Sequence, residues 1–172
     1  MTEVRPLAPA EALGRLDELC ALLRDAVEDG ASIGFLAPLA GAEAEAYWGS
    51  VVEALAGGRC VLLAALADGR VVGAVQLGLE ARANGRHRAE LMKLMVLRAQ
   101  RRRGIGRALM GAALAEADRL GRSLLLLDVR AGDPAEALHR SLGFVPIGRV
   151  PRYARSPGGS LAATCFYYLE RG

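Results

Sequence analysis

The segment Arg98-Ala-Gln-Arg-Arg-Arg-Gly-Ile-Gly-Arg-Ala-Leu-Met110 decides the fold. It follows an apolar, strand-like run at residues 90–97 and opens an amphipathic helix that extends to about Leu120. Gly104 and Gly106 have no side chains, so their backbone amides can approach a ligand closely. The helix behind them directs unpaired N–H groups and its positive dipole end at the same point. The segment therefore predicts a strand, a basic glycine loop and a helix N-terminus that together bind a pyrophosphate.

Two other phosphate-binding motifs fit this segment less well. A P-loop requires Gly-x-x-x-x-Gly-Lys-Ser/Thr, and Lys93 is the only lysine in the chain. A dinucleotide fingerprint would find its acidic residue in Asp128, but Leu109 occupies the position of its third glycine. Residues 99–103 also make the strand-to-helix loop too long for the tight turn of that fingerprint.

The motif Gln/Arg-x-x-Gly-x-Gly/Ala is matched by Arg101-Arg102-Arg103-Gly104-Ile105-Gly106. Here the chain resembles the GNAT superfamily of N-acetyltransferases, in which this loop binds the pyrophosphate of acetyl-CoA. Residues 4–7 resemble the first strand of the family, and residues 135–144 resemble its late helix and Gly-Phe turn. More narrowly, three stretches look like the tabtoxin-resistance-type acetyltransferases: residues 31–39, 89–96 and 127–130.

The resemblance implies an α/β GNAT fold in one domain over residues 3–172. Its sheet is mixed, mostly antiparallel and six- to seven-stranded, with splayed central strands flanked by helices. Asp68-Gly69 predicts a tight hairpin, and Asn84-Gly85 predicts a second turn. Periodicity predicts strands at 2–7, 60–67, 70–80, 90–97, 123–129, 144–150 and 164–169, and helices at 11–28, 42–56, about 104–120 and 134–142.

The same resemblance assigns the residues that bind acetyl-CoA. It implies that the splayed fourth strand pairs its exposed backbone with the pantetheine arm. The residues assigned to that strand edge are Met95, Val96 and Leu97, and those assigned to the phosphate loop are Arg101, Arg102, Arg103, Gly104, Ile105, Gly106 and Arg107.

Two acids are candidates for the base that deprotonates the acceptor amine. Asp128 ends an apolar strand beside the expected cleft, where partial desolvation would raise its pKa toward that of a useful base. An aspartate at the matching place is thought to be the base in tabtoxin-resistance-type enzymes. Glu90 lies fourteen residues before Gly104, an offset similar to that of the catalytic glutamate in histone acetyltransferases of the superfamily. We rank Asp128 first, and either acid has a plain structural alternative as a hydrogen-bonded or ion-paired carboxylate.

The residue expected to protonate the leaving thiolate differs from the family pattern. Leu-Tyr-x-x-x-Gly-Phe is replaced by Leu138-His139-Arg140-Ser141-Leu142-Gly143-Phe144, so His139 stands where the family has tyrosine. With an ordinary pKa near ~6.5, histidine can donate a proton around neutrality. The alternatives are a packing role for His139 and a donor among Tyr153, Tyr167 and Tyr168.

The acceptor pocket is expected beneath the loop at residues 31–41, which covers the acceptor in this fold. Phe35 and nearby Trp48 are its candidate lining residues, with core packing as their alternative role. An apolar lid suggests a small, partly apolar amine.

Composition agrees with a single enzyme domain of 172 residues. The formal charge is +3 and aromatic content is 5%, with no stacking platform, so we expect no nucleic-acid partner. We expect no membrane partner and no metal, because no apolar span and no metal-ligand spacing occurs. The sequence predicts a cytoplasmic acetyl-CoA-dependent N-acetyltransferase, monomeric or homodimeric, that acts by direct transfer on a small amine. The alternatives are acetylation of protein or peptide N-termini, and a catalytically weak acyl-CoA-binding module.

Overall fold

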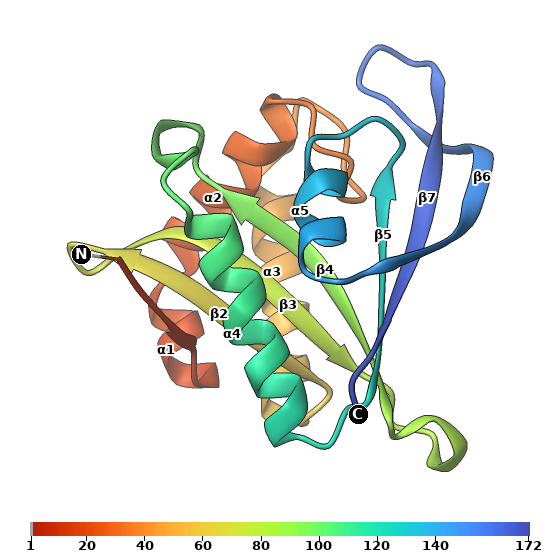
Figure 1. The fold of residues 1–172 in the computed structure, drawn as a ribbon. Helices are drawn as coiled ribbons and strands as arrows, with labels where there is room; N and C mark the ends of the chain where they lie inside the picture. Colours follow the sequence, from red (N-terminus) through yellow and green to blue (C-terminus); the bar gives the residue numbers. More distant parts are fainter. Residues whose placement is uncertain (1) are drawn as a thin grey trace.

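A computed structural model describes residues 2–172. A sheet of seven strands runs through it in the order β1-β2-β3-β4-β5-β7-β6 (Figure 1). Only the β4–β5 pair is parallel, and all others are antiparallel. The strands are β1 (Thr2–Pro6), β2 (Cys60–Ala67), β3 (Arg70–Leu79), β4 (Arg88–Val96), β5 (Leu124–Arg130), β6 (Val145–Arg155) and β7 (Leu161–Glu170).

Five α-helices and two short 3₁₀ turns complete the described chain. Figure 1 shows α1, α2 and α3 on one face of the sheet and α4 and α5 on the other. The helices are α1 (Pro9–Gly14), α2 (Leu16–Glu28), α3 (Gly41–Ala56), α4 (Ile105–Arg119) and α5 (Ala135–Ser141), and the 3₁₀ turns are Ala83–Gly85 and Arg98–Gln100. The predicted α/β fold with a mixed, mostly antiparallel sheet is confirmed.

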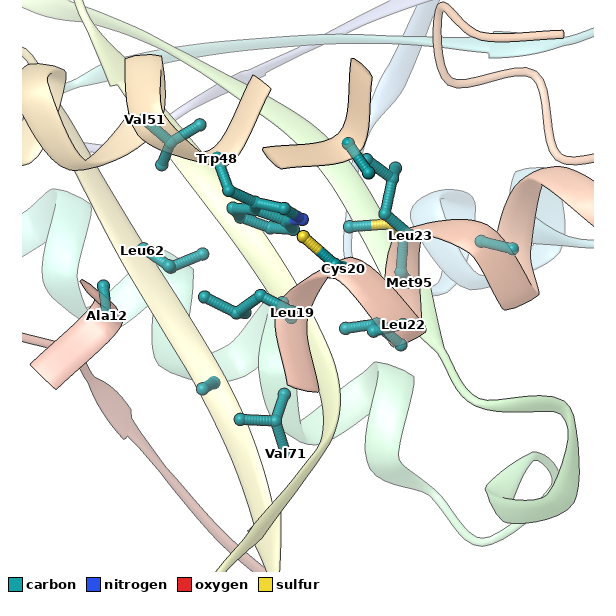
Figure 2. Packing of buried hydrophobic residues seen from close by; sticks show 14 of the residues in the cluster. Ala12, Leu19, Cys20, Leu22, Leu23, Trp48, Val51, Leu62, Val71 and Met95 are labelled. Atoms are coloured by element: carbon teal, nitrogen blue, oxygen red, sulfur yellow. The ribbon is translucent and has the colours of Figure 1, made fainter. Parts of the chain in front are cut away.

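Each face of the sheet carries its own hydrophobic core, because side chains along a strand alternate between faces. On β2, Leu62, Ala64 and Leu66 pack toward α1, α2 and α3, whereas Leu63 and Ala65 pack toward α4. Figure 2 shows the first core, in which Trp48 of α3 lies against Cys20 and Leu19 of α2. β2 is therefore a central strand with both faces covered.

The single helix predicted over residues 11–28 is wrong, because the chain forms two helices that meet at Arg15. Arg15 has φ −111° and ψ 17°, outside the helical region. Gly14 has low helix propensity, and the Arg15 guanidinium donates to the Gly69 carbonyl at 2.8 Å. The break turns Leu13 to solvent, with 57% of its surface exposed, although its spacing placed it on the buried face.

The last two strands are longer than their apolar patterns predicted. β6 is an edge strand in which all residues but Ala154 are exposed, so its burial pattern lacks the alternation that defines a half-buried strand. Strand pairing instead extends it, because Ala154 and Arg155 still pair with Ala162 and Leu161 of β7.

The region that positions the site lies where β4 and β5 part. Their pairing is confined to Arg88, Ala89 and Glu90 opposite residues 124–126, so the predicted splay of the central strands is present. Within β4, Met92 pairs with Gln76 and Met95 with Ala74, which places two residues of β4 opposite Val75 alone. This β-bulge contains Lys93, whose φ of 55° is in the left-handed region.

No helix among residues 2–172 is long and apolar enough to cross a membrane.

Candidate active site

A cavity of about 780 Å³ opens between β4 and β5 beyond Glu90. Because the two strands no longer pair there, the edge of β4 that faces β5 is left without a strand partner. Met95 and Val96 line this cavity, as expected of residues that offer backbone to the pantetheine arm. Leu97 lies outside the lining, and its amide donates to the Val72 carbonyl at 2.9 Å. Two of the three residues assigned to this edge thus face the cavity.

The N-terminus of α4 forms one wall of the cavity. Gly104 is its N-cap with φ 78°, and a Cβ there would meet no atom within 4 Å. The Ala108 amide makes its bond to the Gly104 carbonyl at 3.0 Å, and the amides of residues 105–107 precede it in the first turn. Open space in front of unpaired amides at a helix N-terminus fits a pyrophosphate, so the residues present fit acetyl-CoA.

The side chains of the glycine loop differ in what they contact. Arg102 lines the cavity, and no side-chain hydrogen bond or ion pair of Arg102 occurs among residues 2–172. Arg101 also lines it, but its guanidinium pairs with Asp29 of the α2–α3 loop at 2.5 Å. Arg103 and Arg107 lie outside the lining, and Arg107 donates to the Ser141 hydroxyl at 2.8 Å.

The remaining two loop residues, Ile105 and Gly106, also line the cavity. Ile105 is buried with 4% of its surface exposed and packs into the α4 core, while still contributing to the cavity lining. Gly106 also lines the cavity, and the nearest atom to a Cβ there would be Leu138 Cδ2 at 3.7 Å.

The two candidate bases differ in their access to the cavity. Asp128 lines it, whereas Glu90, on the paired part of β4, does not. Burial raises the pKa of Asp128, and the Lys93 ammonium partly opposes that shift. Burial also raises the pKa of Glu90, and the Asp128 charge raises it further. Both carboxyls keep an opening to solvent, so a proton can be exchanged there. Access to the cavity favours Asp128.

His139 of α5 lines the cavity and is 5% exposed. Its ring lies edge-on to Phe144 with centroids 6.1 Å apart, and its Nδ1 has no hydrogen-bond partner among the described residues. Burial lowers the pKa of His139, and Asp133 and Glu136 oppose the shift only in part. This shift favours the neutral imidazole over the imidazolium that the sequence suggested as the proton donor.

The three tyrosines named as alternative donors are unequally placed. Tyr153 of β6 lines the cavity and packs edge-on against Phe166, with 54% of its surface exposed. Tyr167 is fully buried, and its hydroxyl donates to Glu136 and accepts from Arg140. Tyr168 lies outside the lining. Tyr153 alone among the three reaches the cavity.

The expected acceptor pocket needs a correction at Trp48. Its side chain is fully buried in the core beneath α2 and α3 and lies outside the cavity lining (Figure 2). The helical face that carries Trp48 points into the sheet, so packing and not ligand contact explains its position. Phe35 is half-buried and packs edge-on against Tyr47 at 5.0 Å between centroids. The loop lines the cavity through Ala31, Ser32, Ile33 and Gly34 instead.

Sequence reasoning missed four charged residues at the cavity: Asp29, Lys93, Arg130 and Asp133. In the sequence Lys93 argues only against a P-loop, yet it lines the cavity. Arg130 also lines it, and its guanidinium donates to the Gly30 carbonyl at 2.8 Å. Asp29 lines it as well and forms an ion pair with Arg101. The sequence signal for Lys93 is that it is the only lysine in the chain, whereas Asp29 and Arg130 have no local signal.

Comparison with known proteins agrees with this geometry. Residues 16–144 match the model of the acetyltransferase (GNAT) family. A ribosomal-protein-alanine N-acetyltransferase from Brucella melitensis is 27% identical, with a TM-score of 0.82 over 98% of this chain and 99% of that one. A putative acetyltransferase from Salmonella typhimurium, solved with its cofactor acetyl-CoA, is 22% identical, with a TM-score of 0.79 over 99% and 94%. The ribosomal-protein-S18-alanine N-acetyltransferase from Escherichia coli is 22% identical, with a TM-score of 0.72 over 99% and 94%.

The family model covers most of the chain, and the glycine loop and the splayed strands lie where an acetyl-CoA-dependent enzyme needs them. The chain therefore belongs to the GNAT family of acetyltransferases.

Proposed function

We propose that this acetyltransferase transfers the acetyl group of acetyl-CoA directly to the amine of a small molecule, through one N-acetyltransferase domain at residues 3–172. The observation that carries the proposal is that the α4 N-terminus and Asp128 line the same cavity. A phosphate-binding end and a partly desolvated carboxylate on one cavity bring cofactor and acceptor together. We also propose that the enzyme is of the tabtoxin-resistance type and that it acts in the cytoplasm.

Acetyl-CoA, when bound, supplies the thioester whose acetyl group is transferred. Residues of this chain would bind it in two places: the backbone edge at Met95 and Val96, and the loop at Arg102, Gly104 and Gly106. Arg101, which also lines the cavity, would join them by leaving its ion pair with Asp29. These residues would bind and orient acetyl-CoA. The proton transfers would be made by side chains on β4, β5, α5 and β6.

In this proposal Asp128 takes the proton from the acceptor ammonium and so frees the amine lone pair for attack. Its raised pKa makes it a better proton acceptor than an ordinary aspartate. Glu90 stays the second candidate, because burial and the Asp128 charge both raise its pKa. The departing thiolate takes its proton from Tyr153 or, where its ring is protonated, from His139, since both line the cavity. Because the transfer is direct, the reaction does not pass through an acyl-enzyme on a cysteine.

A second candidate function is acetylation of a protein N-terminus. The observation that favours it is the resemblance, at 27% identity and nearly full coverage, to a ribosomal-protein-alanine N-acetyltransferase. Such an enzyme would accept the α-amine of an extended chain in place of a small molecule.

Thiol release from acetyl-CoA tests these functions against a panel of small amines and a peptide with N-terminal alanine. The small-amine proposal predicts amine-dependent thiol release and a product heavier by one acetyl group in the mass spectrum. Turnover of the peptide alone would establish the second function. Tight CoA binding without turnover of any acceptor would indicate a binding module and reject both.

A further inference from the structure

Lys93 is unusual in this chain by its residue type alone. Of 22 cationic side chains, it is the only lysine, and all the others are arginine. Arginine serves every ion pair with a carboxylate among residues 2–172, whether on the surface or partly buried. Lys93, the one Lys/Arg side chain that is not arginine, lines the candidate active-site cavity.

The bulge in β4 determines where Lys93 lies. Bulges re-aim side chains, and Lys93 occupies the left-handed position of this bulge with φ 55°. Its Nζ lies 6.0 Å from the Phe35 ring centroid, and a Cβ on Gly34 would be 3.4 Å from it. The ammonium thus reaches from the sheet to the acceptor loop and forms part of the cavity wall between them.

The ammonium of Lys93 has no close anionic partner among residues 2–172. No carboxylate lies within 4.0 Å of it among the described residues, and it makes no hydrogen bond to them. Burial lowers the pKa of Lys93, and the longer-range charges of Asp128 and Glu90 oppose that shift. A partly desolvated cation without a partner is unfavourable, so it is expected where a ligand supplies the partner.

We propose that Lys93 binds the carboxylate of an amino-acid acceptor whose amine is presented to Asp128. This inference rests on the proposed function and narrows it to a zwitterionic substrate class. Of the other cations in the cavity lining, Arg101 and Arg102 are assigned to the phosphates, and Arg130 pairs with Asp133 at 3.6 Å. Lys93 and Asp128 are therefore the cation and the anion left for an acceptor that carries both charges. A single ammonium near Asp128 and Glu90 suits a singly charged carboxylate better than a doubly charged phosphate, which both acids would repel.

Matched acceptors test the substrate class. The wild-type enzyme is assayed with acetyl-CoA and L-amino acids, their α-amides and their decarboxylated amines. The amide has a less basic amine than the amino acid and the decarboxylated compound a more basic one, so a preference over both cannot come from basicity. We expect kcat/KM to be roughly ten- to a hundredfold higher for the acid than for either neighbour, the usual range for loss of a charge-assisted contact.

Substitution of Lys93 tests the residue. We expect Lys93→Met to reduce the preference for acid over amide by roughly ten- to a hundredfold, mainly through KM, and Lys93→Arg to restore part of it. Arg82→Met is the matched control, because it removes one positive charge from a side chain that is 82% exposed and outside the cavity. An unchanged preference in Lys93→Met would overturn the proposal. The proposal would also be overturned if Lys93→Met shifted the acidic limb of the kcat/KM profile by the same amount for the amino acid and its amide. Lys93 would then act only on the pKa of Asp128.

Binding can be observed without turnover because the chain has a single lysine. Lysine labelled with ¹³C at Cε gives one signal, and we expect L-amino acids to shift it in the presence of CoA, with little effect of their amides. Equal shifts by acid and amide would contradict the inference. If small amines are acetylated equally well with and without a carboxylate, this inference is wrong but the proposed function still holds. A preference for the amide, which resembles a peptide N-terminus, would favour acetylation of protein N-termini.

Discussion

At the scale of single residues, the structure separates acids that the sequence ranks only by pattern. Asp128 and Glu90 both have raised pKa values, but only Asp128 lines the cavity. A base must lie within reach of the proton it removes, so cavity access is the stronger criterion.

We expect Asp128→Asn to lower kcat/KM by roughly 10²–10⁴-fold, the usual contribution of a general base. Because burial raises the pKa of Asp128, the acidic limb of the wild-type profile should lie above the ordinary aspartate value of ~3.9. Activity then falls as the pH drops through that raised pKa, and the limb disappears in Asp128→Asn. The pH dependence of kcat/KM measures both effects. Glu90→Gln is the control, and a comparable loss there with nearly normal Asp128→Asn would transfer the role to Glu90.

His139 makes a prediction about stability as well as activity. Its pKa is lowered in the folded state, so below the ordinary value of ~6.5 the unfolded chain binds more protons than the folded one. Stability at this position is therefore present at neutral pH and is lost as the pH falls from ~6.5 through the lowered pKa of the folded state. We expect the free energy of unfolding to decrease less between pH 7 and pH 5 in His139→Phe than in the wild type. Urea titrations at several pH values measure it, and parallel curves for the two proteins would contradict a buried neutral ring.

The same substitution tests proton donation to the thiolate. If His139 is the donor, single-turnover transfer slows in His139→Phe while the affinity for acetyl-CoA stays nearly constant, because the phosphate loop lies on α4. Rapid-quench measurement is required, since product release can hide the chemical step. Equal single-turnover rates would assign His139 to packing and leave Tyr153 or water as the proton source.

At the scale of elements, α4 carries its binding function at its N-terminus. Gly104 has φ 78° and open space in front of it, so a side chain there would enter the approach of the pyrophosphate. We expect Gly104→Val to abolish measurable acetyl-CoA binding in calorimetry. Gly121, just past the other end of α4, has φ 66° and equally open surroundings. Gly121→Val pays a similar backbone strain but should bind normally, and equal loss in both variants would show that strain and not the loop explains the effect.

The junction of α2 with the glycine loop is a second feature at this scale. Arg101 pairs with Asp29, and Arg98 pairs with Asp25 at 2.8 Å, so the end of α2 is tied to the segment that precedes α4. Arg130 of β5 holds the next residue of the same loop through the Gly30 carbonyl. These contacts place the acceptor loop against the cofactor loop.

At the scale of the whole molecule, two cores on opposite faces of the sheet support one cavity at the splayed edge. Trp48 belongs to the core beneath α2 and α3, where it is fully buried (Figure 2). We expect Trp48→Ala to reduce the free energy of unfolding by about 3–5 kcal/mol, the usual range for truncating a buried aromatic side chain. Denaturant unfolding measures it, with Leu13→Ala as an exposed control. A small change in stability with a large rise in acceptor KM would restore Trp48 to the pocket.

The sequence by itself determined the features that depend on neighbouring residues. The Asp68-Gly69 hairpin is one, because φ values of 49° and 75° are those that this pair of residues tolerates best. The glycine loop before α4 is another, because its spacing alone places open backbone at a helix N-terminus. The family followed from this local motif.

Tertiary structure decided the features that depend on contacts between distant segments. Trp48 and Phe35 are similar apolar candidates in sequence, yet only packing against α2 commits Trp48 to the core. Lys93 enters the cavity because β4 bulges opposite Val75, and no local pattern marks that bulge. His139 has a lowered pKa because α5 folds onto Phe144 and Tyr167, which excludes water from its ring. Burial, register and charge environment arise only when remote strands and helices meet, so the chemistry of these side chains was set by the fold and not by their neighbours in the chain.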